Sequence, residues 1–266
     1  GLGDVYKRQP RPSHSDYPAY VKYQGNNDIR GGGHFSGRLT APLVFAGAVA
    51  KQILAQKGIT VGAHILSING VLDNNFDNAN VSKKELLAVS SKAFCVINDE
   101  IEDKMRASVE KARLDGDSVG GVIECAVVGV PVGIGANIFS TVEGHISSAL
   151  FGVPAVKGVE FGAGFDFAKM TGYEANDTYS ILNGNVKINK NNNGGVLGGM
   201  TTGAPIIVRA VVKPTPSISK AQKSVNLQKM TEEELVIHGR HDPCIVPRAV
   251  PVVESAVAFA LLDLMA

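Results

Sequence analysis

Two long, alanine-rich apolar segments predict the principal helices of the chain. Residues 39–56 are apolar around nearly the whole helical circumference. Thr40 is a plausible N-cap for this helix, Pro42 fits its first turn and Gly58 ends it. A helix with this pattern is expected to be buried, between two layers of the fold. A second alanine-rich helix is predicted from about residue 249 to residue 264.

Shorter apolar segments rich in Val and Ile predict strands. The first strand ends at an Asn-Gly turn signal, and a short helix is expected at residues 141–151. The strands lack the continuous Val/Ile runs of a doubly wound parallel sheet, and none leads into a GxGxxG motif. The alternation of helices and strands therefore indicates a layered α/β or α+β domain. The predicted strands are residues 59–69, 118–130, 155–161 and 204–212.

Polar segments separate these elements. Ser82 and Glu85 have the spacing of a capping box. Residues 98–114 carry acids early and bases late, which favours an exposed amphipathic helix. Residues 173–193 are polar and are expected to form a loop. Two glycine pairs, at positions 194–195 and 198–199, suit either a close approach of the backbone to a ligand or tight packing between strands.

Composition mainly excludes classes of protein. The chain has 266 residues, of which 44% are hydrophobic and 19% charged, and its formal net charge is +1. These values are typical of a globular protein without a nucleic-acid or membrane signature. No apolar run approaches eighteen residues, so no membrane span is expected. Cys95, Cys125 and Cys244 are widely spaced without a CxxC pair, which favours free thiols in a reducing compartment and argues against a metal site.

Residues 1–9 differ in character from the rest of the chain. They lack the apolar segment of a signal peptide. They resemble a translated adapter sequence, so we interpret them as a non-native leader. Residues 10–266 then form the domain proper, and the natural protein is expected to begin further upstream.

Candidate chemistry is concentrated at residues 11–17 and 30–38, ahead of the first long helix. The glycines at positions 31–33 allow backbone amides to approach an anion, and arginines such as Arg11 and Arg38 supply forked donors that suit phosphate. His14 is able to move a proton near neutral pH. Asp16, two residues on, shares its face in an extended segment and is expected to orient it. A basic pocket for a phosphorylated or flavin-like ligand and a solvated surface loop both fit this pattern.

Two later segments add charged groups. Arg240, His241 and Asp242 lie between Gly239 and Pro243, where the carboxylate acts either as a base or as one half of a salt bridge at a strand end. The KPTPS segment at residues 213–217 offers an ammonium group and two hydroxyls on a stiff backbone. It is either an anion contact or a proline-rich connector.

Other reactive residue types are assigned to structure. His64 and His145 lie within apolar patterns and are expected to be structural, and Cys244 is expected to be inert. Ser36, His14 and Asp242 have the residue types of a hydrolase triad. However, no G-x-S-x-G elbow surrounds Ser36, which argues against that function.

An ordered series of motifs resembles the chorismate synthase family. The motifs are RPSHSDY, RGGGHFSGR, GDSVGG, AVKGVEFG, NNNGGVLGG, KPTPS and GRHDPCIVPRAVP, and they run from residue 10 to the end of the chain. The GRHDPC motif, together with the AVKGVE and KPT motifs, is highly specific. The resemblance covers essentially the whole chain outside the leader.

The resemblance implies a fold and an activity. The fold is an α+β β-α-β sandwich, with a helical layer between two antiparallel β-sheets. The activity is that of a carbon-oxygen lyase (EC 4.2.3.5) in the shikimate pathway of aromatic amino acid biosynthesis. It converts 5-enolpyruvylshikimate 3-phosphate to chorismate and phosphate by anti-1,4-elimination. Reduced FMN is the implied cofactor and NADPH a possible reductant. A cytoplasmic homotetramer without nucleic-acid or membrane partners is expected.

The resemblance also implies residue roles. His14 matches a histidine thought to protonate the reduced flavin, and Asp242 matches an aspartate that helps remove the ring proton. Ser36 completes the catalytic set. The substrate-binding residues implied are Arg11 and Arg38. His34 stands where many members have Arg, which weakens phosphate binding. The implied cofactor-binding residues are His34, Phe35, Ser36, Pro154, Ala155, Gly198, Lys213, Pro214, Thr215, Pro216, Ser217 and Arg240.

One departure from the family pattern bears on activity. The family's N-terminal block, with its other catalytic histidine in a Ser-His-Gly setting and its arginines for substrate and NADPH, is not found in this sequence. General acids typically contribute several powers of ten. We therefore expect the polypeptide as given to fold poorly or to be nearly inactive. The alternative function is a fragment that keeps only flavin binding or oligomer assembly.

Overall fold

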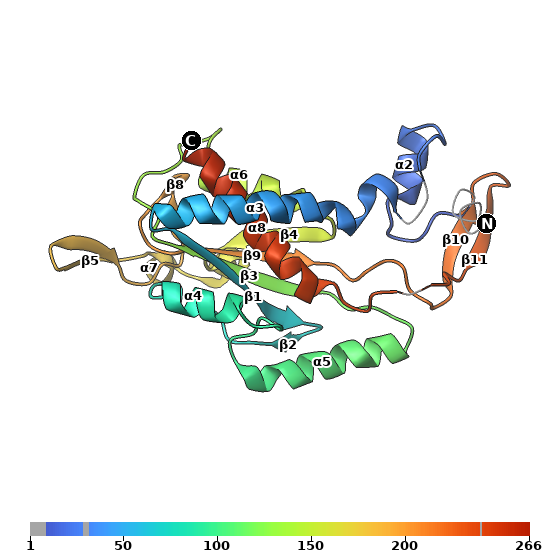
Figure 1. Ribbon diagram of the computed structural model, residues 1–266, viewed down its shortest axis with the longest axis horizontal. Coiled ribbons are helices and arrows are strands. Elements are labelled where there is room, and N and C mark those ends of the chain that lie inside the picture. Colours follow the sequence, from blue (N-terminus) through green and yellow to red (C-terminus); the bar gives the residue numbers. More distant parts are fainter. Residues whose placement is uncertain (1–8, 29–31, 240) are drawn as a thin grey trace.

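A central antiparallel sheet organises the structure, a computed structural model that describes residues 9–28, 32–239 and 241–266. In the described part of the chain this sheet has five strands in the order β2-β1-β3-β9-β4 (Figure 1). Every neighbouring pair of its strands is antiparallel. The strands are β1 (Thr60–Ile68), β2 (Val71–Leu72), β3 (Gly121–Val128), β4 (Val156–Phe161) and β9 (Ile206–Val212).

The two faces of the sheet carry different residues, because successive side chains of a strand alternate between its faces. On one face Val61, Ala63 and Ile65 of β1 lie beside Ile123 and Cys125 of β3, and none of the five is more than 4% exposed. These residues belong to the main hydrophobic core. Their β-branched and small side chains explain why the predicted strands form here.

Helices cover both faces. α8 and α6 pack against the main core, and α3 packs on the outside of α8 (Figure 1). α4 covers the other face together with the loop that precedes it, and α5 lies along the β2 edge. The helices are α3 (Thr40–Gln56), α4 (Lys83–Ser90), α5 (Asp99–Leu114), α6 (Val142–Phe151) and α8 (Val246–Leu264).

The crossing of α3 and α8 requires small residues. A Cβ added to Gly47 of α3 would lie 2.2 Å from the Cβ of Ser255 in α8, well inside van der Waals contact. Beside this crossing, Lys51 forms an ion pair with Glu254, whose side chain also accepts the amide of Ala63 at 2.9 Å. The two helices are thereby tied to each other and to β1.

The prediction that residues 39–56 are buried all round is wrong for the described chain. Within α3 only Gly47, Ala50 and Leu54 are buried, and Phe45 is 76% exposed. The contact with α8 is narrow because it is made by small side chains, so the opposite face stays outside. Thr40 is also not the N-cap, because Leu39 takes that position.

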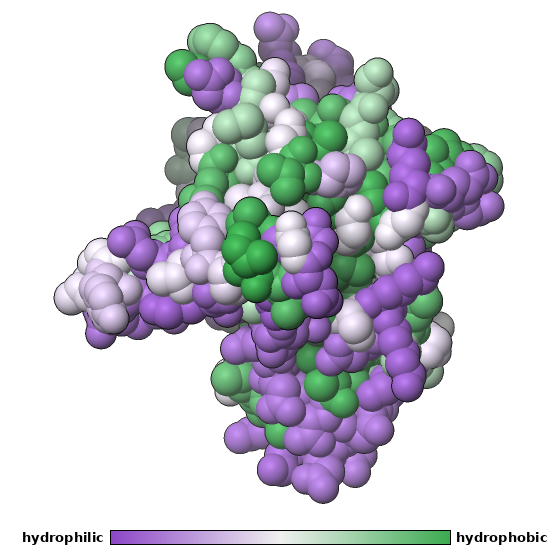
Figure 2. Space-filling view, turned by 90° about the vertical axis from the view of Figure 1, so that its left-hand side faces the viewer, coloured by the Kyte–Doolittle hydropathy of each residue, from purple (hydrophilic) through white to green (hydrophobic). Residues whose placement is uncertain are grey.

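The exposed apolar side chains of α3 are part of a wider surface feature. Figure 2 shows hydrophobic residues gathered in the upper half of the face it presents, at the level of α3, α6 and α8, with mainly hydrophilic residues below. By length and composition alone, Gly37–Gln56 qualifies as a candidate membrane span, with a mean hydropathy of 1.2. One such helix is weak evidence for a membrane protein.

The predicted helix starts are largely confirmed. Ser82 and Glu85 form a capping box at α4, and Asn98 caps α5. Thr141 caps α6 by accepting the amide of Gly144 at 2.9 Å. α8 begins at Val246, ahead of the predicted start, because a proline is tolerated in the first turn of a helix.

Three short hairpins lie outside the central sheet in the described part of the chain, and one of them replaces a predicted loop. The polar segment 173–193, expected to be a loop, contains β5 and β6 as well as the end of a short helix, α7 (Gly172–Ala175). β10 and β11 form a second hairpin near the N-terminal segment (Figure 1), and β7 and β8 a third. The hairpin strands are β5 (Tyr179–Leu182), β6 (Asn185–Ile188), β7 (Val196–Leu197), β8 (Met200–Thr201), β10 (Gln222–Asn226) and β11 (Thr231–Leu235).

The α+β class with an antiparallel sheet is confirmed, but the sandwich is incomplete in the described part of the chain. The helical layer formed by α3, α6 and α8 has the five-stranded sheet on one side only. No second sheet of comparable size lies beyond it among the described residues. In agreement with this, the outer face of α3 is exposed in the described part of the chain, where Phe45 is 76% exposed.

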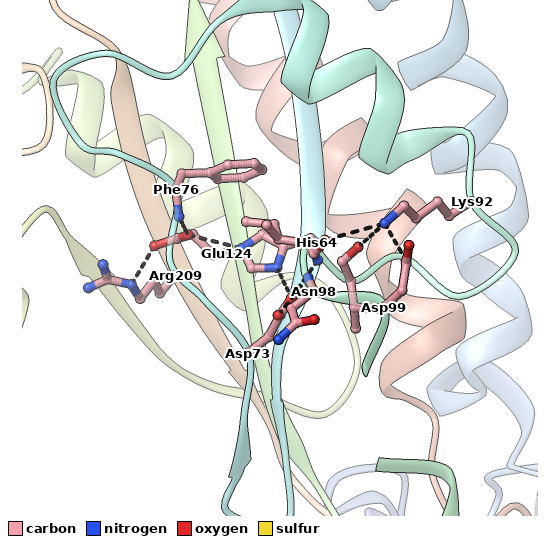
Figure 3. Close-up of polar contacts among 10 residues, drawn as sticks. His64, Asp73, Phe76, Lys92, Asn98, Asp99, Glu124 and Arg209 are labelled. Carbon is pink, nitrogen blue, oxygen red and sulfur yellow. Dashed lines mark hydrogen bonds and ion pairs between the residues drawn. The ribbon is translucent and has the colours of Figure 1, made fainter. Parts of the chain in front are cut away.

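A buried ionic network lies on the face of the sheet that α4 covers (Figure 3). His64 of β1 contacts Glu124 of β3 through Nε2 at 3.0 Å. Its Nδ1 lies 3.3 Å from Asp73 without the alignment of a hydrogen bond. The Glu124 carboxylate in turn accepts hydrogen bonds from Arg209 Nε at 2.8 Å and from the backbone amide of Phe76 at 2.7 Å. The structural role predicted for His64 is confirmed by this burial.

The network holds its members in their charged forms. Burial opposes the charge of His64, but its contacts with Asp73 and Glu124 outweigh that effect and raise the imidazole pKa above the ordinary 6.5. Burial also opposes the charge of the carboxylates, yet their contacts with His64 and hydrogen bonds from backbone amides hold the pKa of Asp73 below 3.8 and that of Glu124 below 4.5.

Replacing Glu124 with Gln is expected to destabilise the fold strongly. The change leaves His64 and Arg209 without their shared counter-ion, and removing one partner of a buried pair costs about 3–5 kcal/mol of unfolding free energy. Denaturant titration followed by circular dichroism measures this loss. The matched control is Glu110→Gln, whose partner Arg113 is exposed on α5. An equally small effect at both positions would contradict the network's importance.

The same network predicts the sign of the pH dependence. Asp73 and Glu124 contribute stability that is complete above pH 4.5 and is lost as the pH falls through their lowered pKa values. His64 contributes stability that is complete below pH 6.5 and is lost as the pH rises through its raised pKa. Glu124→Gln is expected to weaken the dependence of the unfolding free energy on pH, both below pH 4.5 and above pH 6.5.

Candidate functional site

A cavity of about 1060 Å³ brings together residues from both ends of the chain. Its walls come from residues 11–15, 32–37, 151–157, 213–217, 237–238 and 241–245. The fold accounts for this gathering, because β9 ends just before residue 213, β4 begins at residue 156 and α8 begins at residue 246. The predicted site residues that line it are Arg11, His14, His34, Phe35, Ser36, Pro154, Ala155, Lys213, Thr215, Pro216, Ser217 and Asp242.

His14 is held in a tight turn before α2 (Asp16–Lys22). Its Nδ1 lies 2.6 Å from Asp16 Oδ1, and its backbone amide donates to the carbonyl of Arg11 at 3.2 Å. The predicted contact between His14 and Asp16 is therefore confirmed. The predicted reason is wrong, because the segment is a turn into a helix and not an extended strand.

Arg11 has a different environment from the one expected of a substrate-binding residue. Its guanidinium donates to both carboxylate oxygens of Asp16, at 2.7 and 2.8 Å, and its side chain is 8% exposed. Burial alone would raise the pKa of Asp16, but hydrogen bonds from Arg11 and His14 hold it far below its usual range. The forked donor that sequence reasoning assigned to phosphate is used within the protein.

Asp242 lies on the opposite wall of the cavity. Its Oδ2 pairs with Arg248 Nη1 at 2.6 Å, and its Oδ1 is 3.4 Å from the amide of Cys244. The side chain is 23% exposed, so the carboxylate is open to the cavity while one oxygen is anchored. The neighbouring His241 is fixed by a 2.9 Å contact between Nε2 and the carbonyl of Ile237.

The KPTPS segment joins the two walls. Lys213 Nζ donates to the carbonyl of Ser13 at 2.7 Å, next to His14. Thr215 Oγ1 donates to the carbonyl of Asp242 at 2.7 Å, and its own carbonyl accepts Ser118 Oγ at 2.7 Å. Residues 213–217 therefore connect two parts of the chain and also contribute to the cavity wall.

Two features shape the remaining walls. Ala155 has a φ of +73°, a left-handed conformation that costs a residue with a side chain about 1–2 kcal/mol. Its carbonyl accepts the amide of Lys213 at 2.9 Å, which holds the strained peptide against the cavity. Ser36 Oγ accepts the amide of Arg38 at 3.3 Å and begins a 3-10 turn, Gly37–Leu39.

Some predicted site residues lie elsewhere. Gly198 is not part of the cavity wall and occupies the turn of the β7–β8 hairpin with a φ of +60°. Pro214 and Arg38 adjoin lining residues without lining the cavity themselves. Arg240 lies outside the described residues. Neither alternative offered for the glycine pairs applies at Gly198, because a Cβ added there would meet only Met200 Cε, at 3.8 Å.

Sequence reasoning missed several cavity residues. His238, Lys157 and Phe151 line the cavity, as does His241, which was named as a candidate group but given no role of its own. The sequence signals were available for three of them, because Lys157 stands inside the AVKGVE motif and the two histidines stand at the GRHDPC motif. Among the residues that the structure describes, no cluster of three or more His, Cys, Asp or Glu is arranged to hold a metal ion.

Comparisons with known proteins agree on one family. The sequence model of chorismate synthase matches residues 4–266. A chorismate synthase of Thermococcus gammatolerans is 51% identical over 97% of this chain and 70% of its own length. One of Korarchaeum cryptofilum is 49% identical over 96% of this chain and 70% of its own. A crystal structure of chorismate synthase is similar with a TM-score of 0.76 and 28% identity, covering 94% of this chain and 68% of that one.

Cys244, beside the cavity wall, is expected to resist alkylation in the folded protein. Burial raises its thiol pKa to about 11, so at pH 8 only about one thiol in a thousand is the reactive thiolate. Iodoacetamide labelling followed by peptide mass spectrometry measures this. The same reagent is expected to label Cys244 rapidly after unfolding in urea. Equal labelling rates in the two states would show that the thiol is not buried.

Proposed function

Because the chain belongs to the chorismate synthase family, we propose that its 1060 Å³ cavity is the active site of that enzyme. The family consists of lyases of aromatic amino acid biosynthesis that act on 5-enolpyruvylshikimate 3-phosphate and require a reduced flavin. The observation that carries the proposal is the shared cavity of His14 and Asp242, which are more than two hundred positions apart in the sequence.

The cavity suits two ligands bound together. Ligand pockets typically measure roughly 300–1,000 Å³, so its size, about 1060 Å³, leaves room for both a flavin and a small phosphorylated substrate. Phe35 and Phe151 offer apolar surface for a flat ring, and Lys157 and Lys213 offer positive charge for phosphate. These residues fit FMN, and we propose reduced FMN as the flavin.

The substrate loses a ring proton and phosphate without net oxidation or reduction. The electrons of the broken C–H bond form a new double bond, the existing double bond shifts, and phosphate departs with the electrons of the C–O bond. A bound reduced flavin supplies electron density that assists the departure of phosphate. The protein must therefore accept one proton and stabilise one developing anion.

Asp242 is proposed as the group that receives the ring proton. Its carboxylate pairs with Arg248 through Oδ2, accepts only a long hydrogen bond, 3.4 Å, from the Cys244 amide through Oδ1, and lines the cavity. A carboxylate held this way stays oriented without losing its basic lone pairs. His14 is proposed to transfer a proton through Nε2, because Nδ1 is already engaged by Asp16.

Ser36 and the lysines are proposed to bind phosphate. The Ser36 hydroxyl oxygen accepts a hydrogen bond from the backbone amide of Arg38, so its own proton remains available to donate to a phosphate oxygen. Lys213 approaches the cavity while bound to the Ser13 carbonyl. Arg38, immediately after this wall, is proposed as an additional phosphate ligand, because it is exposed next to the cavity.

The oligomeric state, the cellular location and the reductant are each proposed from a single observation. The exposed apolar face of α3 supports a homotetramer, and three free cysteines support a cytoplasmic location. NADPH as the reductant rests on the family resemblance alone.

The proposed function predicts flavin-dependent phosphate release and a dependence on Asp242. With chemically reduced FMN and 5-enolpyruvylshikimate 3-phosphate in anaerobic assays, each chorismate formed is expected to be matched by one phosphate released, and neither product is expected with oxidised FMN. Asp242→Asn is expected to lower kcat by about 10²- to 10⁴-fold, because removing a general base has that effect.

Two controls separate the alternatives. Asp117→Asn changes a carboxylate that pairs with Lys220 on the surface and is expected to leave kcat unchanged. Titration with reduced FMN tests the pocket without turnover. Flavin binding without phosphate release would favour a flavin-binding module, and the absence of both would refute the proposal.

A further inference from the structure

Asp16 stands behind His14 with respect to the cavity. His14 lines the cavity and Asp16 does not. The side chains are 15% and 7% exposed, so their 2.6 Å contact between Nδ1 and Oδ1 is shielded from solvent. No hydrogen bond to Nε2 of His14 is made within the described part of the chain. One ring nitrogen is thus committed to the protein and the other is available to a ligand.

The donor and acceptor roles in this contact follow from chemistry. An ionised carboxylate only accepts hydrogen bonds, and a guanidinium only donates them. The lowered pKa of Asp16 keeps its carboxylate ionised at neutral pH. Arg11 Nη2 lies 3.1 Å from the same Nδ1 atom and could only donate to it. The contact with the ionised Asp16 is shorter, at 2.6 Å, and it requires a proton on Nδ1. A neutral His14 in this arrangement has its lone pair on Nε2, on the cavity side.

Arg11 makes the arrangement rigid. Its Nε and Nη2 atoms bind the two oxygens of Asp16 at 2.7 and 2.8 Å, and the backbone amide of Arg11 also donates to Oδ2 at 3.0 Å. The carboxylate therefore has no freedom to rotate away from His14. Lys213 donates a further hydrogen bond to the backbone carbonyl of Ser13, the residue before His14. Ser13 itself has a φ of +57°.

We propose that Asp16 and Arg11 are positioning residues that hold His14 in the Nδ1–H form and present Nε2 to the ligand. Arg11 lines the cavity as well as holding Asp16. The catalytic consequence rests on the proposed function, but the protonation pattern of His14 does not, because it requires neither flavin nor substrate.

Asp16→Asn tests the proposal by reversing the pattern. An amide has one accepting oxygen and one donating NH₂ group. If its oxygen faces the Arg11 donors, its NH₂ group faces His14 and forces Nδ1 to accept. The proton then moves to Nε2. In a catalytic triad the corresponding Asp-to-Asn change leaves the geometry intact, yet it lowers kcat about 10⁴-fold through the wrong tautomer.

The direct measurement is nitrogen NMR of the protein labelled with ¹⁵N-histidine. The chain has six histidines, and loss of one signal set in His14→Gln assigns His14. The wild-type protein is expected to show the Nδ1–H tautomer of His14, and Asp16→Asn the Nε2–H tautomer. An Nε2–H tautomer in the wild type, or an unchanged tautomer in Asp16→Asn, would overturn the proposal.

Kinetics with reduced FMN provide the second measurement. Asp16→Asn is expected to lower kcat by about 10²- to 10⁴-fold with KM within about threefold, because a transition-state contact is lost and ground-state binding is not. A rise in KM at constant kcat would show that Asp16 serves binding and not proton transfer.

Arg11→Lys covers the case in which Asp16→Asn fails to fold. This variant keeps a cation beside Asp16 but loses the paired hydrogen bonds of the guanidinium. The Nδ1–H tautomer of His14 is therefore expected to persist, while kcat falls about tenfold. Loss of the Nδ1–H form in this variant would contradict the assignment of the proton to the Asp16 contact.

The matched control is Arg113→Lys, which breaks an equivalent fork with Glu110 on the exposed face of α5. It is expected to change neither the tautomer nor kcat. The outcomes also separate the two hypotheses. The expected tautomers without turnover would refute the proposed function alone, and turnover with the wrong tautomers would refute the positioning role alone.

Discussion

Two hydrogen bonds from the segment after β9 hold the candidate site together. Lys213 donates to the carbonyl next to His14, and Thr215 donates to the carbonyl of Asp242. The segment itself is fixed, because β9 pairs with both β3 and β4 inside the central sheet. Residues from the two ends of the chain therefore meet because a buried strand directs one short segment between them. The cavity depends on the sheet in this direct sense.

The sheet in turn tolerates charge in its interior. His64, Glu124 and Arg209 come from three adjacent strands and satisfy one another on the face beneath α4. Such a network adds little stability over apolar residues, but it penalises any other register strongly, because a shifted strand would leave buried charges unpaired. We interpret it as a device that fixes the alignment of β1, β3 and β9, and with it the point at which β9 delivers Lys213 to the site.

Much of the architecture was predictable because local signals determine it. Val- and Ile-rich segments indicated the main strands. The Ser82–Glu85 capping box indicated the start of α4, and the distribution of acids and bases over residues 98–114 indicated α5. The burial of α3 was mispredicted, because an apolar helix does not encode whether a partner covers it. Hairpins such as β5–β6 were missed, because their strands are short and their side chains mostly exposed. Motifs identified most of the cavity residues, whereas the engagement of Arg11 by Asp16 depends on a turn that residue types alone do not specify.

The distance along the chain between His14 and Asp242 has a thermodynamic consequence. A ligand that contacts both walls binds only when nearly the whole polypeptide is folded, so its binding free energy adds to global stability and not to that of one segment. At a free concentration one hundred times its dissociation constant, such a ligand contributes about 2.7 kcal/mol. Any ligand that bridges the two walls therefore stabilises the fold as a whole, and its removal leaves a more readily unfolded protein.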